Sequence, residues 1–145
     1  MAFIVREAQV YSLSVKEYNG TFPGYGVHIE SSKPDTIILF ADVDKNNSYE
    51  EEVDGVVKEY KIQTNSGISS LCGDGKKNFP SPGICELSQI DIVYLRPNPI
   101  VTIKGKDKDG FPVSPNFSDV EISISSPGGA NKNIIIWVSG QITIE

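Results

Sequence analysis

The sequence predicts an α+β domain, with one N-terminal amphipathic helix packed on antiparallel β-sheet of about eight or nine short strands. Three observations lead to this class. The first 18 residues carry a helical spacing of apolar side chains, whereas the remainder is divided into short runs rich in β-branched and aromatic residues. The chain also holds 13 glycines and 9 prolines, which is typical of a sheet protein with many turns. With 145 residues it is long enough to bury one core, so residues 1–145 are predicted to form a single domain.

The predicted helix occupies residues 1–19. Apolar side chains recur there at intervals of three and four residues, which places them on one face of a helix. The residues expected to pack against the sheet are Ile4, Ala8, Tyr11, Val15 and Tyr18. Asn19-Gly20 is a typical helix stop, because glycine adopts the left-handed conformation that a C-terminal cap requires. No capping residue precedes the pattern, which favours a helix that began further upstream.

The strands are predicted from runs bounded by Gly, Pro, Asn or Asp. One run, Val120 to Ser125, alternates apolar and polar side chains as a half-buried strand does. The last two runs are joined by Ser139-Gly140, which suits a hairpin. The predicted strands are residues 26–30, 36–41, 56–62, 67–71, 90–95, 100–104, 120–125, 134–138 and 141–144.

Composition and charge argue against several classes of function. The net charge of −6 and the pI of about 4.8 disfavour a general nucleic-acid binder. No apolar run reaches the ~20 residues that cross a bilayer. The single histidine, His28, lies among apolar residues and is expected to be structural. One histidine and two cysteines in the whole chain offer little for a histidine-based triad or a zinc site, so no enzyme is predicted.

An acidic turn between two predicted strands is the most distinctive local stretch. Oxygen-bearing side chains alternate along it, as in the first half of a calcium loop, and calcium takes six to eight oxygen ligands. The match is partial: Asn47 stands where such a loop has its glycine, and Val53 where the bidentate glutamate belongs. A solvated acidic turn without metal is therefore the other interpretation. The candidate calcium ligands are Asp42, Asp44, Asn46, Ser48, Glu50 and Asp54.

The two cysteines, Cys72 and Cys85, enclose a polar loop rich in glycine and proline. We predict a disulfide across the base of this loop, because an even cysteine count in an acidic sheet domain favours an oxidising compartment. Two unpaired thiols or half of a metal site are the alternatives, and the latter has no further ligands nearby.

The order of these segments resembles that of type IV pilin-like proteins, close to the minor pseudopilins of type II secretion (the H type). A helix is followed by a strand containing Gly24-Tyr25-Gly26-Val27-His28-Ile29 and then by a strand containing Ile37-Ile38-Leu39-Phe40-Ala41-Asp42. An Asp- and Asn-rich turn with a tyrosine, here Tyr49, comes next. The closing strand pair with its Ser-Gly turn matches residues 134–144. The resemblance covers nearly the whole chain.

The resemblance implies a non-enzymatic structural subunit of a type IV pilus or type II secretion pseudopilus, outside the bacterial inner membrane. Its partners would be other pilin or pseudopilin subunits, and the membrane itself through an apolar N-terminal helix of roughly 20 residues. That helix, a leader and a prepilin peptidase site are not in this sequence. The chain is therefore expected to be the soluble part, with residues 1–19 as the C-terminal half of the long pilin helix and residues 20–145 as a β-rich head. Secretion, adhesion and DNA uptake remain open, and the acidic charge disfavours DNA uptake.

A free-standing extracellular calcium-dependent binding or adhesion module of sandwich type is the alternative function. Such a module explains the strands, the acidic turn and the disulfide equally well. It explains the N-terminal amphipathic pattern poorly.

Overall fold

The computed structural model describes residues 10, 17–18, 20, 23–62, 65–77, 80, 83–94 and 101–145. These residues form nine strands, all paired antiparallel. The strands are β1 (Gly24–Glu30), β2 (Thr36–Asp42), β3 (Gly55–Lys61), β4 (Gly67–Gly73), β5 (Gln89–Tyr94), β6 (Val101–Lys106), β7 (Asp119–Ser125), β8 (Asn131–Trp137) and β9 (Ile142–Ile144).

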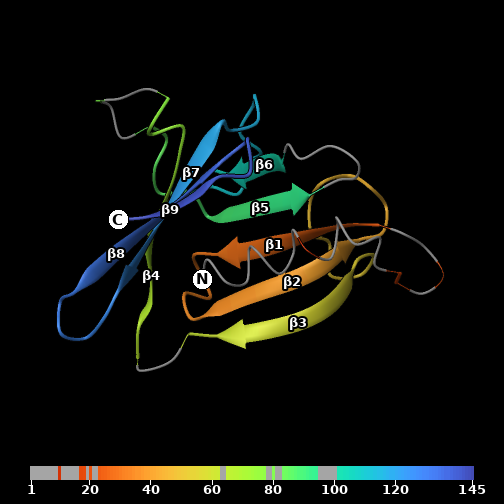
Figure 1. The fold of residues 1–145 in the computed structure, drawn as a ribbon, viewed down its shortest axis with the longest axis horizontal. Coiled ribbons are helices and arrows are strands. Elements are labelled where there is room, and N and C mark those ends of the chain that lie inside the picture. Colours follow the sequence, from red (N-terminus) through yellow and green to blue (C-terminus); the bar gives the residue numbers. More distant parts are fainter. Residues whose placement is uncertain are drawn as a thin grey trace.

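The strands are divided between two sheets. The larger sheet has the order β3-β2-β1-β5-β6 and the smaller one β4-β7-β8-β9. Figure 1 shows the strands of the smaller sheet crossing those of the larger one at a steep angle. The chain passes between the sheets after β3, after β4 and again after β6, so neither sheet is a separate unit along the sequence.

The hydrophobic core lies between the two sheets. Alternate residues of each strand point inward, as Val27 and Ile29 do on β1 and Ile37 and Leu39 on β2. The core cluster contains Val27, Ile29, Ile37, Leu39, Ile68, Leu71, Leu87, Ile90, Ile92, Tyr94, Val101, Ile103, Phe117, Val120, Ile122, Ile134 and Ile136. Every strand except β3 and β9 contributes to it, and Val57, Tyr60 and Ile142 of those two pack against its rim. Burial of these side chains from both sheets is what holds the sandwich together.

The opposite face of the larger sheet is also buried at its centre. Phe40 and Val93 are fully buried, yet neither belongs to the core cluster. Between them lies Gly26, where an added Cβ would sit 2.9 Å from each side chain and 2.7 Å from the carbonyl oxygen of Ile92. Strand β1 is consequently buried on both faces, and glycine is the residue that lets these neighbours approach its backbone.

One aromatic ring, that of Phe117, is wedged between a glycine of each sheet. A Cβ on Gly73 of β4 would lie 2.4 Å from this ring, and one on Gly105 of β6 would lie 2.6 Å from it. The segment before β7 also forms a bridge from Phe117 to Ile103 of β6, with a 2.9 Å hydrogen bond to the Ile103 carbonyl. Two glycines thus make room for the contact that ties the edge of one sheet to the other.

The prediction of an α+β class, with a helix packed on the sheet, is wrong. In the part of the chain that the structure describes, both layers around the core are sheets and no element is a helix. Ile4, Ala8, Tyr11 and Val15 lie outside the described residues, and Tyr18 forms a β-bridge with its ring over Gly55. Spacing along the sequence is a local signal, whereas the class depends on which elements supply the core.

The nine predicted strand runs are all present, each within three residues of its predicted bounds. Among the described residues, no helix has the length and apolar character needed to span a membrane.

Replacing Gly105 with alanine is expected to lower the free energy of unfolding by about 1–3 kcal/mol, because the new methyl group would overlap the Phe117 ring and press on the Gln89 carbonyl. Urea unfolding of purified protein measures this. Gly128→Ala is the matched control, since nothing lies within 4 Å of its added Cβ, and it should change stability by less than about 0.5 kcal/mol. Equal effects of the two substitutions would contradict the packing of Phe117.

Candidate functional site

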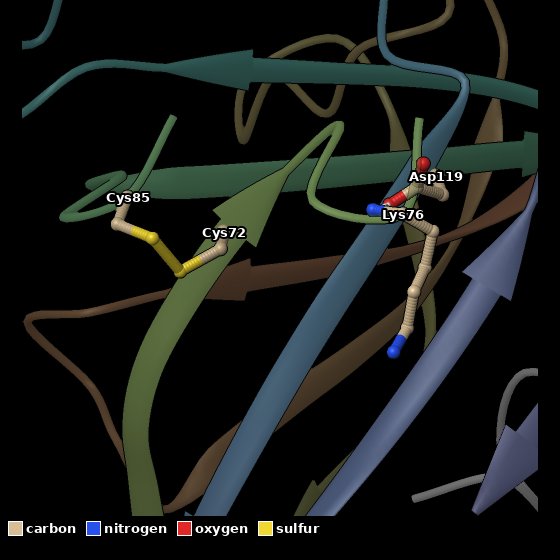
Figure 2. The surroundings of a disulfide bond; sticks show 4 residues. All are labelled: Cys72, Lys76, Cys85 and Asp119. Atoms are coloured by element: carbon tan, nitrogen blue, oxygen red, sulfur yellow. Dashed lines mark hydrogen bonds between the residues drawn. A yellow bond between two sulfur atoms is a disulfide. The ribbon is translucent and has the colours of Figure 1, made fainter. Parts of the chain in front are cut away.

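The predicted disulfide between Cys72 and Cys85 is formed (Figure 2). It joins the end of β4 to the segment that leads into β5, so it links the two sheets at one end of the sandwich. Beside it, Gly73 and Ile84 exchange two backbone hydrogen bonds of 2.8 Å. The base of the loop is therefore closed both covalently and by a β-bridge.

The loop enclosed by the disulfide is fixed by two buried carboxylates. The two oxygens of Asp119 accept hydrogen bonds from the backbone N–H groups of Lys76 and Lys77, each at 3.0 Å. In the reverse direction, Asp74 accepts one from the N–H of Ser118 at 2.6 Å. In Figure 2 the Lys76 side chain extends away from Asp119, so the carboxylate holds the backbone rather than the ammonium group. This region has a structural role in anchoring the loop.

A second polar group lies on the outer face of the larger sheet, centred on His28. Its Nδ1 is 2.5 Å from Oδ1 of Asp91, the residue directly opposite on β5, and its Nε2 is 2.7 Å from Oε1 of Glu30. The Tyr49 ring lies against the imidazole, with the ring centroids 4.8 Å apart. Asp91 is only 2 % exposed, and Gln89 donates to its second oxygen at 3.1 Å.

These contacts favour a charged histidine. Burial would lower the pKa of His28, but the hydrogen bonds and charges of Asp91 and Glu30 outweigh it and raise the pKa above its ordinary value of 6.5. The hydrogen bond to His28 in turn lowers the pKa of Glu30. Because both ring nitrogens face carboxylates, the arrangement is that of a buried ion pair, as expected for a structural histidine.

The acidic turn between β2 and β3 gathers half of the candidate calcium ligands. One carboxylate oxygen each of Asp42, Asp44 and Asp54 lie within 4.8 Å of one another. The Glu50 carboxylate is not part of this group. The Asn46 amide donates to the Glu50 carboxylate, and Ser48 lines a separate cleft of about 280 Å³ beside Lys104.

The turn fixes two of its three gathered carboxylates by hydrogen bonds from its own backbone. Asp54 accepts from the N–H of Val43 at 2.8 Å and from that of Glu50 at 2.9 Å. Asp42 accepts from the N–H of Asn47 at 2.9 Å through Oδ2. Burial raises the pKa of Asp42 to about 6, with the nearby carboxylates of Asp44 and Asp54 adding to the shift.

Sequence reasoning missed the partners of His28 and the carboxylates of the disulfide loop. Asp91 is 63 residues from His28, and Asp119 is 43 residues from Lys76. Their pairing depends on strand register and sheet order, which no local pattern gives. The one available signal was the position of His28 between apolar residues in a strand, since a histidine on a buried strand needs a polar partner.

Searches with the chain against protein-family models, curated proteins and solved structures return no match.

Removing the disulfide is expected to cost about 3 kcal/mol of unfolding free energy, because the bond closes a loop of 13 residues in the unfolded chain. The test is urea unfolding of the Cys72→Ser/Cys85→Ser variant against the oxidised protein. Ser70→Ala, an exposed position on the same strand, serves as control and should lose less than about 0.5 kcal/mol. A loss below about 1 kcal/mol in the double variant would mean that the bond contributes little to stability.

The pKa of His28 can be read directly, since it is the only histidine in the chain. In a proton NMR titration we expect its midpoint above 6.5 and a lower midpoint in Asp91→Asn, which removes the carboxylate charge. The raised pKa contributes stability that is fully present below pH 6.5 and is lost as the pH rises through the folded-state value. Unfolding free energy should therefore fall more between pH 6 and 9 in wild type than in His28→Gln. A wild-type midpoint at or below 6.5 would contradict the ion pair.

Proposed function

We propose that the protein is a non-enzymatic structural subunit of an extracytoplasmic filament, of the minor pilin or pseudopilin kind. The observation that carries the proposal is the order of the segments that resemble the pilin-like family. Those segments are now β1, β2, the acidic turn with Tyr49, and the β8–β9 pair. They are the centre of one sheet and the closing hairpin of the other, so the resemblance involves residues that build the head.

The disulfide supports the extracytoplasmic part of the proposal. Structural disulfides persist in oxidising compartments and are rare in the cytosol. The bond between Cys72 and Cys85 joins the two sheets and leaves no free cysteine among the described residues. The outer side of a bacterial inner membrane is such an oxidising compartment.

The edges of the larger sheet disfavour assembly by adding strands to this sheet. At one edge, β3 exposes the charged residues Lys58, Glu59 and Lys61, and charged edges oppose strand pairing with another chain. At the other edge, β6 is already bridged to Pro112 and Phe117. A subunit of this kind needs another element to assemble, and in the proposal that element is an apolar helix preceding the head, which would also anchor the subunit in the inner membrane.

A free-standing extracellular binding or adhesion module is the second candidate, and the two-sheet architecture favours it. Among the described residues the core needs no helix as a layer, so the sandwich has the build of an independent module. The two candidates differ in the N-terminus of the mature protein, which separates them.

The decisive measurement is the N-terminal sequence of the protein isolated from its native host, by mass spectrometry of membrane and secreted fractions. The filament subunit predicts a mature N-terminus that opens an apolar helix of about 20 residues, and recovery with sheared surface filaments or with the membrane. Removal of a secretory signal peptide, with the protein free in the extracytoplasmic fraction, would overturn the proposal in favour of the binding module. A glycan array would then be the next experiment.

A further inference from the structure

The cluster of Asp42, Asp44 and Asp54 brings together three carboxylates from the two ends of the acidic turn. Asp42 ends β2, Asp44 follows two residues later, and Asp54 immediately precedes β3. One oxygen of each lies within 4.8 Å of the others. Lys104 approaches the same turn, but its Nζ donates to the backbone oxygen of Asn46 at 2.8 Å.

An independent observation at Asp42 points to a missing partner. Its side chain is 0 % exposed, and among the described residues no donor lies within hydrogen-bonding distance of its Oδ1. Asn47, whose backbone N–H donates to the other oxygen of Asp42, holds a second such acceptor. Its side-chain amide oxygen is also buried, and the described residues supply no donor to it. A buried acceptor without a partner costs about 1–3 kcal/mol, and more when it is charged.

The remaining carboxylates suit a cation that takes oxygen ligands. Both oxygens of Asp54 are held by backbone N–H groups, and each keeps a lone pair for a further contact. Asp44 is exposed and supplies a carboxylate on the solvent side of the cluster. The set contains neither thiolate nor imidazole, so it favours a hard cation over zinc.

We propose that this cluster binds a calcium ion through the carboxylates of Asp42, Asp44 and Asp54. Calcium accepts irregular oxygen sets completed by water, whereas magnesium demands near-octahedral geometry and dehydrates reluctantly. The ligand set thus differs from the alternating one that the sequence suggested, because the Glu50 carboxylate is bound by the Asn46 amide and Ser48 lines a separate cleft.

The expected affinity follows from the proposed location outside the cytoplasm. Extracellular modules bind calcium with dissociation constants of about 0.1–1 mM, and this part of the inference rests on the proposed function. The site itself does not, since binding is measured on the purified chain whether or not it assembles into filaments.

The test is isothermal titration of the chelator-treated 145-residue protein with calcium chloride, together with thermal unfolding. Calcium at about ten times the dissociation constant should raise the melting temperature by about 3–5 °C. Magnesium chloride at the same concentration should raise it by less. Asp42→Asn should abolish the calcium response and melt no lower than wild type in chelator, because the amide removes one of three like charges.

Two further variants keep the test interpretable. Asp44→Asn changes an exposed residue, so it should fold normally and weaken calcium binding about tenfold or more. Asp109→Asn removes the same charge from an exposed loop residue outside the cluster and should respond to calcium as wild type does. Absence of saturable binding below about 10 mM calcium would overturn the proposal. So would equal calcium responses of Asp44→Asn and Asp109→Asn, because that result would show only general charge screening.

Discussion

Burial of β1 on both faces is the constraint on which the rest of the structure depends. This strand is the middle one of the larger sheet, paired with β2 on one side and β5 on the other. Its inward residues Val27 and Ile29 enter the core between the sheets, while Gly26 admits Phe40 and Val93 on the opposite face. A strand in this position cannot shift its register by one residue, because that would move each set of side chains to the other face.

The polar groups of the larger sheet follow from that register. His28 faces away from the core on β1 and is only 3 % exposed, so its ring needs polar partners close by, and the register with β5 sets Asp91 directly opposite. The pairing of Gly24 with Asp42 likewise fixes where β2 ends and the acidic turn begins. Tyr49 then returns from that turn to pack on both His28 and Phe40.

The strands could be predicted from the sequence, but their arrangement could not. Runs such as 36–41 and 120–125 are bounded by turn residues and keep the period of a strand, so local chemistry decides them. The strand order β3-β2-β1-β5-β6 depends instead on which apolar faces meet in the folded chain. The contact of Phe117 with Gly73 and Gly105 and the pairing of His28 with Asp91 depend on it too. The α+β prediction failed for a related reason, since a periodic stripe does not show what packs on it. In the acidic turn the sequence indicated the residues at either end, whereas the hydrogen bonds that turn Glu50 away depend on the folded loop.

The acidic turn differs from the other sites of buried carboxylates in how completely its carboxylate oxygens are hydrogen-bonded. Asp91 and Asp119 each have a donor for both oxygens, although one is paired with a histidine and the other with two backbone N–H groups. Asp54 is satisfied in the same way. Among the buried aspartates that the structure describes, only Asp42 has a fully buried oxygen that no donor reaches. A fold that supplies donors to both oxygens of Asp54, Asp91 and Asp119 leaves one oxygen of Asp42 without a donor where two more carboxylates converge. A cation would bind that oxygen and offset the three like charges at once.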